Sequence, residues 1–193
     1  MENLLGKNKV LTAVFISGKG TNLKKLIQFS KTKNSPIKIS LIVSSNSKAE
    51  GLKYSLKHKI KKYVVTINDR NFEDKILKNL KINKIQFICL AGYMKILSKK
   101  FIKNFKGKII NIHPSLLPKY KGLNTHEKVI KYKEKYTGCT VHYVNDKLDS
   151  GKIILQKKIK IFKNDNPKSI KRRVLNEEHQ TYYKAILKIF NVI

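Results

Sequence analysis

Short apolar runs alternate with helix-patterned segments along this chain, and this alternation constrains the fold more than any other feature. Residues 10–16 form an apolar run with β-branched side chains, which is typical of a buried strand. Residues 21–30 then place leucine and isoleucine at helical spacing. The same order recurs, with strands expected at 37–43, 63–66, 86–90 and 109–112 and helices at 49–57, 71–82 and 124–133.

The last third of the chain departs from this order. Residues 139–144 and 152–161 are typical of two strands joined by a short link, which predicts an antiparallel edge. Asn166 and Pro167 predict the start of a last helix, with Asn as the cap, that runs almost to the C-terminus. The predicted fold class is therefore α/β, with a mostly parallel, twisted, Rossmann-like sheet, an antiparallel edge and helices on both faces.

One domain, residues 1–193, accounts for the sequence, because no repeat, low-complexity segment or linker interrupts it. A hydrophobic content of 41% is enough to bury a core. No apolar run approaches the roughly 20 residues of a membrane helix, and no signal peptide is visible. Cys89 and Cys139 lie far apart and form no CxxC motif, so a disulfide framework and a zinc site are not expected and a cytoplasmic location fits.

The formal net charge of +31 raises the question of nucleic-acid binding. Only three of the 43 basic residues are arginines, whereas proteins that grip phosphate favour the bidentate arginine fork. The lysines are spread along the chain, and no Arg-rich or aromatic-studded patch is visible in the sequence. We therefore expect a solvated lysine surface with weak, salt-sensitive, non-specific polyanion binding and no specific nucleic-acid partner.

The first strand ends in Ser17-Gly18-Lys19-Gly20-Thr21-Asn22, where a helix is expected to begin. Glycines let the backbone approach a ligand, and the N–H groups at a helix start attract phosphate. The segment is neither a GxGxxG fingerprint nor a P-loop. A phosphate site for a mononucleotide-sized ligand and an ordinary turn capped by Thr21 or Asn22 explain it equally well.

The fifth strand leads into Asn111-Ile112-His113-Pro114 and then Ser115. Because residues two apart in a strand share a face, Asn111 and His113 should project together while Ile112 turns into the core. An amide beside an imidazole can hold a developing oxyanion. A strand-end histidine in a plain turn is the alternative, and the cluster of Asn, His and two prolines argues against it.

The sixth strand carries His142 and leads into a polar loop that contains Asp149. A carboxylate in that loop could orient an imidazole or relay a proton, although a single loop aspartate more often caps a turn. The remaining histidines, His58, His126 and His179, have no ligand-like spacing, so no metal site is expected.

Four segments in order resemble one known family: residues 17–23, 90–98, 111–118 and 138–142, with Asp149-Ser-Gly151 after them. Together they resemble the phosphoribosylglycinamide formyltransferases, within the folate-dependent formyltransferase superfamily. The resemblance extends from about Val10 to the last helix. The segment at 111–118 is common to the superfamily, whereas the segment at 17–23 and the short chain point to this member.

The resemblance implies an activity. The amine of glycinamide ribonucleotide would attack the formyl carbon of 10-formyltetrahydrofolate, a co-substrate, in purine biosynthesis without a metal. Asn111 and His113 would stabilise the tetrahedral oxyanion, and Asp149 would position His113 and take up the amine proton. His142 and Ser115 would support them.

The same resemblance implies where the substrates bind. Substrate phosphate and ribose would contact Gly18, Gly20, Thr21, Asn22 and Glu178. The folate would contact Arg70, Met94, Lys95, Ile96, Leu97 and Val144. Leu117–Pro118 would be a cis peptide.

Two positions depart from the family pattern. Lys95 stands where Arg is common, and Leu175 stands where related enzymes often carry Lys or Gln near the phosphate. Lys19 and Arg172 could substitute for the missing phosphate contact.

Alternatives remain within and outside the superfamily. A formyl-folate hydrolase or a tRNA formyltransferase would usually carry an extra domain, for which 193 residues leave little room. A basic RNA-binding protein is the alternative from another class. The partners expected are thus the two small molecules, with no membrane, and the chain is a monomer or a homodimer.

Overall fold

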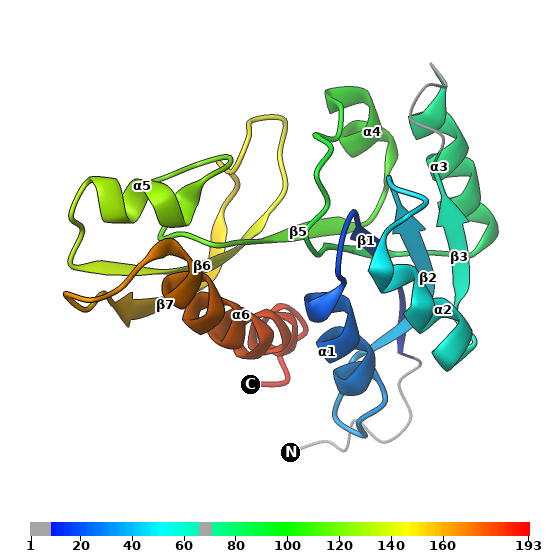
Figure 1. Cartoon of the computed structure of the whole chain (residues 1–193). Helices are drawn as coiled ribbons and strands as arrows, with labels where there is room; N and C mark the ends of the chain where they lie inside the picture. The colour runs from blue at the N-terminus through cyan, green and yellow to red at the C-terminus, as the bar shows by residue number, and fades with distance from the viewer. Residues whose placement is uncertain (1–8, 66–70) are drawn as a thin grey trace.

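Seven strands form one sheet in the order β3-β2-β1-β4-β5-β6-β7, as the computed structural model shows for residues 9–65 and 71–193 (Figure 1). The strands are β1 (Val10–Ile16), β2 (Ile37–Ser44), β3 (Lys61–Val64), β4 (Phe87–Leu90), β5 (Lys108–His113), β6 (Tyr136–Tyr143) and β7 (Ile153–Lys160). The first five strands pair in parallel, whereas β6 and β7 are antiparallel to their neighbours. The predicted α/β class and its antiparallel edge are confirmed.

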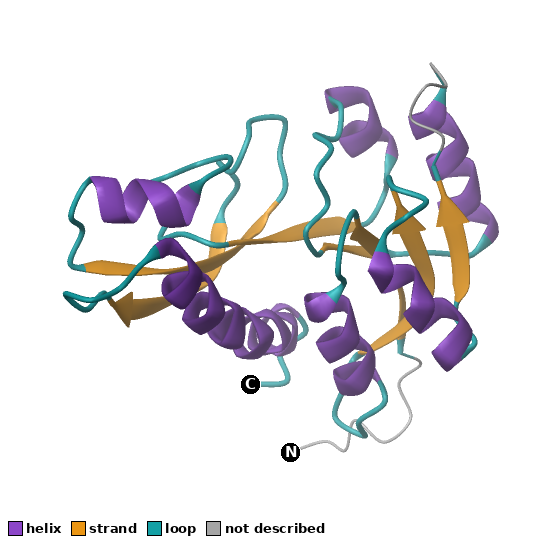
Figure 2. Ribbon diagram, viewed as in Figure 1, coloured by secondary structure: helices purple, strands orange, loops and turns teal. Residues whose placement is uncertain are grey.

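Helices cover both faces of this sheet (Figure 2). They are α1 (Thr21–Ser30), the 3₁₀ turn η1 (Glu50–Leu52), α2 (Lys53–His58), α3 (Phe72–Ile82), α4 (Lys99–Asn104), α5 (Thr125–Lys131) and α6 (Pro167–Ile189). α1 and α6 pack on one face over Val14 and Ile16. α3 and α4 pack on the other face over Ala13 and Phe15, as the two-residue period of a strand requires.

The order of the strands places a crevice between β1 and β4. From β1 the chain proceeds to β2 and β3 on one side, and from β4 to β5 on the other. Such a switch point leaves a crevice at the carboxyl ends of the strands, where open α/β sheets bind ligands. Tyr182 of α6 lies beneath the crevice, and its hydroxyl donates to the Leu90 carbonyl at 2.8 Å.

Several local features differ from the sequence expectations. The helix expected at 49–57 is split into η1 and α2, and β3 begins two residues earlier than expected. Neither Thr21 nor Asn22 caps α1, because the cap position is Gly20 with φ of 69° and no side-chain hydrogen bond. Helix α4 lies in a segment where no helix is expected, since six residues with one buried side chain, Phe101, give no periodic signal.

Other expectations are confirmed. Asn166 caps α6 through bonds from the N–H groups of Lys168 and Ser169, and Pro167 opens the helix, which ends at Ile189. The Leu117–Pro118 peptide is cis. Among the described residues, no helix combines the length and the apolar character needed to span a membrane.

Candidate active site

The register between β5 and β6 brings two polar side chains together at the crevice. Asn111 pairs with His142 across the two strands, and its Nδ2 lies 3.3 Å from the His142 Nε2. The Tyr143 carbonyl, which can only accept, lies 2.8 Å from His142 Nδ1, so Nδ1 carries the proton. His142 Nε2 therefore accepts from the Asn111 amide and fixes its orientation.

His113, the last residue of β5, lies between a carbonyl and a carboxylate. Its Nε2 is 2.8 Å from the Tyr120 carbonyl, so Nε2 carries a proton. Its Nδ1 faces the Asp149 Oδ2 at 3.3 Å. Burial lowers the pKa of His113, and the Tyr120 carbonyl and the Asp149 carboxylate offset this only in part.

Asp149 joins these groups from the loop between β6 and β7. Its backbone is left-handed, with φ of 45°, and its side chain is 7% exposed. Oδ2 accepts from the Gly122 N–H at 2.8 Å, while Oδ1 lies 3.5 Å from the Asn111 Nδ2. Burial raises the pKa of Asp149, but the hydrogen bond that His142 donates when it is protonated and the bond from the Gly122 N–H outweigh burial, so the pKa lies below its usual value and the carboxylate is ionised near neutral pH.

These groups line one wall of a cavity of about 660 Å³. The loop that precedes α4 and the loop between β6 and β7 flank its mouth, and both rise above the sheet in Figure 1. Four apolar residues at the mouth are at least half exposed: Met94, Ile96, Leu123 and Leu148. Such a wall suits a flat, mostly apolar ligand with a few polar groups.

A second group of polar residues lies at the α1–α6 end of the cavity. Asn22 donates to the Glu178 carboxylate at 2.7 Å, and both side chains are buried. Burial raises the pKa of Glu178 to about 7, against the opposing effects of the Asn22 hydrogen bond and the Lys171 ammonium. Lys171 lies two helical turns before Glu178 and also lines the cavity.

Residues 10–186 match the family described as Formyl transferase. The chain belongs to the formyl transferase family. The resemblance expected from the four sequence segments is confirmed.

The family relatives include single-function and multifunctional proteins. The chain is 41% identical over 174 residues to the phosphoribosylglycinamide formyltransferase of Haemophilus influenzae, which covers 88% of this chain and 82% of that protein. It is 39% identical over 183 residues to the trifunctional purine biosynthetic protein adenosine-3 of Gallus gallus, which covers 93% of this chain but only 18% of that protein.

Solved structures of the formyl transferase family share the fold. The phosphoribosylglycinamide formyltransferase from Brucella melitensis superimposes with a TM-score of 0.89 at 36% identity, over 95% of this chain and 96% of that chain. The phosphoribosylglycinamide formyltransferase from Anaplasma phagocytophilum superimposes with a TM-score of 0.87 at 39% identity, over 93% of this chain and 85% of that chain.

The residues that the family resemblance implies do not all lie in the cavity wall. Asn111, His113, His142 and Asp149 line it, as do Asn22, Glu178 and the expected folate contacts Met94, Lys95, Ile96, Leu97 and Val144. Leu97 is only 5% exposed and also packs in the core. Arg70 lies outside the described residues.

Four other implied residues do not line the cavity. Gly18 is exposed and Thr21 half-buried at the start of α1, while Gly20 is buried against Gly51. Ser115 is 1% exposed, and its hydroxyl donates to the Lys119 carbonyl at 2.7 Å. It thus braces the turn that carries the Tyr120 carbonyl.

Two residues that line the cavity of this formyl transferase family member were not predicted from the sequence. Lys171 lines the cavity, whereas Lys19 and Arg172, the substitutes expected from sequence, do not. The spacing of seven residues from Glu178 was the available signal, since it places both on one helical face. His126 also lines the cavity, with its Nδ1 buried and unpartnered among the described residues. It carried no sequence signal.

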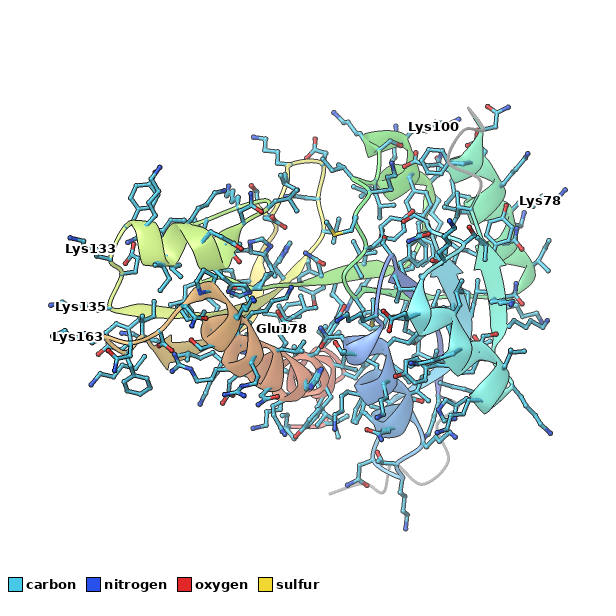
Figure 3. The ribbon with its side chains drawn as sticks, in the orientation of Figure 1. Lys78, Lys100, Lys133, Lys135, Lys163 and Glu178 are labelled. Carbon is cyan, nitrogen blue, oxygen red and sulfur yellow. The ribbon has the colours of Figure 1, made fainter. Side chains whose placement is uncertain are left out.

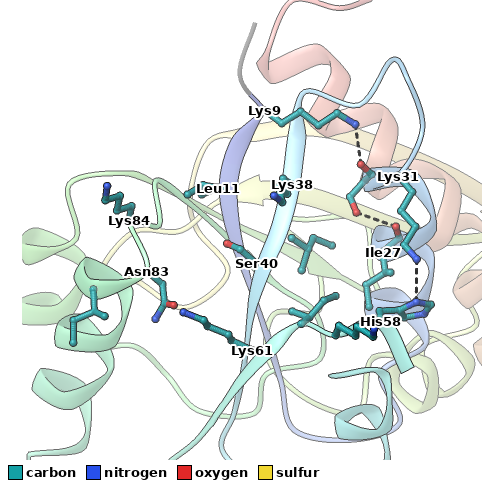
Figure 4. Close-up of a pocket in the computed structure, with 15 residues that line it drawn as sticks. Lys9, Leu11, Ile27, Lys31, Lys38, Ser40, His58, Lys61, Asn83 and Lys84 are labelled. Atoms are coloured by element: carbon teal, nitrogen blue, oxygen red, sulfur yellow. Dashed lines mark hydrogen bonds between the residues drawn. The ribbon is translucent and has the colours of Figure 1, made fainter. Parts of the chain in front are cut away.

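A second cavity of about 680 Å³ lies at the opposite end of the sheet, near the amino ends of β1, β2 and β3 (Figure 4). Six lysines and His58 line it, and Lys31 donates to the His58 Nδ1 at 3.1 Å. It holds no carboxylate and no counterpart of the Asn111, His113 and Asp149 group. The first cavity is therefore the candidate active site. Within residues 9–65 and 71–193, no three His, Cys, Asp or Glu side chains are grouped to hold a metal.

Proposed function

We propose that this chain, as one formyltransferase domain, transfers the formyl group of 10-formyltetrahydrofolate to the amine of glycinamide ribonucleotide in purine biosynthesis. One observation carries the proposal: an amide, an imidazole and an ionised carboxylate, from Asn111, His113 and Asp149, converge within 3.5 Å on the wall of a substrate-sized cavity. The names of the relatives and solved structures supply the phosphoribosylglycinamide acceptor and the formyl group, and the family resemblance implies the folate donor.

The reaction needs an oxyanion to be stabilised and a proton to be moved. The amine attacks the formyl carbon, and the carbonyl electron pair moves onto oxygen. Asn111 has two N–H groups; His142 accepts one, and the 3.5 Å contact with Asp149 is long enough to release the other to the oxyanion.

The proton from the amine goes to the pair formed by His113 and Asp149. Burial keeps His113 neutral before the attack, with the lone pair of Nδ1 facing the Asp149 carboxylate. When this pair takes up the amine proton, His113 becomes an imidazolium as the oxyanion forms. Its positive charge then stabilises the negatively charged intermediate. On collapse the carbon–nitrogen bond to the folate breaks, and that nitrogen receives the proton.

The two substrates occupy opposite ends of the cavity in this proposal. Met94, Ile96 and Val144 hold the pterin, and Lys95 binds the anionic tail of the folate. The resemblance implies Arg70 as a second contact for that tail, and Arg70 lies outside the described residues. The ribose binds Glu178, and the phosphate binds at the start of α1, at Gly18, Gly20, Thr21 and Asn22, with Lys171 in place of Lys19 or Arg172. Lys171 supports this placement because it lines the cavity beside Glu178.

The deciding experiment is turnover of 10-formyl folate, followed by folate absorbance, with and without glycinamide ribonucleotide. Asp149→Asn should lower kcat at least about 100-fold, because it removes the proton acceptor. Asp146→Asn is the matched control: it lies in the same loop and lines the same cavity, but its carboxylate pairs with Lys99 at 3.9 Å and not with His113, so the variant should keep normal turnover. Folate consumption without the amine would indicate a hydrolase instead, and a folded but inactive chain would refute the proposal.

A further inference from the structure

Three exposed aromatic residues lie at or beside the α5–β6 and β7–α6 connections, and none of them lines the cavity. Tyr132 is 62% exposed, Tyr136 42% and Phe162 56%. Six lysines surround them: Lys131, Lys133, Lys135, Lys158, Lys160 and Lys163. We call these nine residues the aromatic–basic corner.

The fold, and not the sequence order, brings the corner together. Tyr136 opens β6 and pairs with Lys160 at the end of β7, and the Ile161 N–H donates to the Lys135 carbonyl at 3.0 Å. The α5–β6 and β7–α6 connections therefore run side by side, and Figure 3 shows Lys133, Lys135 and Lys163 together at that end. The corner is not visible in the sequence, because its members are spread over residues 131–163 and only the pairing of β6 with β7 brings the two connections together.

Each ring already has a cation over it. The Lys158 Nζ lies 3.7 Å from the Tyr136 ring centre, and Lys131 lies 5.9 Å from that of Tyr132. Lys160 and Arg173 lie 5.9 Å and 4.8 Å from the ring of Phe162. The Tyr132 ring also stacks on the Tyr120 ring, with ring centres 6.0 Å apart, so only its other face is open to a ligand. The rings of Tyr136 and Phe162 are covered by flexible cationic side chains, which a planar group can displace.

The charge of the corner decides what can cover it. The two carboxylates in the α5–β6 and β7–α6 connections are already engaged: Glu134 accepts from Lys119 and from the Tyr120 hydroxyl, and Asp165 pairs with Arg173. None of the six lysines has a carboxylate within 4.0 Å among the described residues. A second copy of the chain would bring like charges together, which is unfavourable. A polyanion with planar groups complements both features.

We propose that the aromatic–basic corner binds single-stranded nucleic acid without reading its sequence. Bases stack on the three rings, because every base has a π-face, and the displaced lysines move to the phosphates. The lysine ammonium, a point charge without the arginine fork, suits phosphate neutralisation better than base-edge readout. The corner therefore adds stacking to the weak polyanion binding that the net charge alone would give.

The test compares a fluorescent 12-nucleotide uridine RNA with inorganic polyphosphate, which has the charge but no bases. Tyr132→Ala/Tyr136→Ala/Phe162→Ala in the full chain should weaken RNA binding at least about tenfold and leave polyphosphate binding unchanged. Leu56→Ala/Ile82→Ala, which removes side chains that are 77% and 65% exposed outside the corner, is the matched control and should bind like the parent.

The charge contribution has its own variant. Lys133→Gln/Lys135→Gln/Lys163→Gln should lower the slope of log affinity against log salt by about two for RNA. The control variant Lys78→Gln/Lys81→Gln/Lys103→Gln removes the same number of charges from α3 and α4, and it should change this slope less. Unchanged RNA binding by the aromatic variant, or no RNA binding by the parent, overturns the proposal. So does a dimer that only the aromatic variant disrupts, since it would assign the corner to self-association.

Discussion

Lys171 illustrates how one charge can serve a binding site without touching the reacting atoms. Its ammonium lies near Glu178 and His126, and its charge acts on the pKa values of both. Leu175, one turn along α6 from Lys171, supplies no charge there. A phosphate at this end of the cavity would thus depend on Lys171 for its counter-charge.

We therefore expect Lys171→Ala to raise the KM for the phosphorylated amine about fivefold, the contribution of one partly exposed ion pair. The kcat and the KM for the folate should stay unchanged, because the contact is the same in the ground state and the transition state. Steady-state kinetics with each substrate varied measures this. Arg172→Ala, the neighbouring charge that does not line the cavity, should have no effect. Equal effects of the two variants would point to general charge instead.

The buried carboxyl group of Glu178 should make the free energy of unfolding depend on pH. Its pKa is about 7 in the folded chain and 4.5 in the reference state, so between these values the folded chain holds a proton that the unfolded chain releases. The free energy of unfolding therefore falls as the pH rises from about 4.5 to about 7, and the cost above pH 7 is about 3 kcal/mol.

Glu178→Gln removes this cost, because a neutral amide can still accept from Asn22. Urea unfolding should show the variant more stable than the parent at pH 8 by roughly 1–3 kcal/mol, and the gain should shrink toward pH 5. Glu177→Gln, at the adjacent position of α6, controls for the change in net charge. A gain that is equal at both pH values would show that the carboxylate is not the source.

At the scale of elements, the sequence predicts what local periodicity encodes. The alternation in β5 places Asn111 and His113 on one face, as observed, because a strand has a period of two whatever its partner. The pairing of Asn111 with His142 depends on the register of β5 against β6, which no local pattern determines. Helix α4 and the aromatic–basic corner were not predicted for a similar reason. Helix α4 is too short to show a periodic hydrophobic pattern, and the residues of the corner are too widely separated in the sequence to form one.

Two glycines in the connection from β1 to α1 give a matched pair of tests. Gly20 has φ of 69°, and a Cβ there would lie 2.7 Å from the Gly51 Cα, whereas a Cβ on Gly18 would meet nothing within 4 Å. Gly20→Ala should lower the free energy of unfolding by at least about 1 kcal/mol, from the left-handed backbone and the close approach. It should also weaken substrate binding, since the start of α1 would shift.

Gly18→Ala should be nearly neutral, within about 0.5 kcal/mol. Chemical denaturation of both variants beside the parent measures the difference. Similar losses for the two would mean that the segment needs flexibility throughout, and not one left-handed residue held against η1.

The whole molecule carries 43 basic and 12 acidic residues, and this imbalance has a thermodynamic consequence. Among the described residues, four ion pairs join a lysine or arginine to a carboxylate. Most lysines therefore repel one another without compensation, and repulsion is stronger in the compact state than in the expanded chain.

Salt should therefore stabilise this protein through screening. The Debye length falls from about 30 Å at 0.01 M to about 8 Å at 0.15 M, so most of the repulsion is removed in that interval. The melting temperature should rise steeply with sodium chloride up to about 0.15 M and then level off. A rise that continues linearly to 1 M, with no early steep part, would indicate exclusion of salt from the surface instead of screening. A melting temperature that does not change in the first interval would mean that the lysines are too far apart to destabilise the fold.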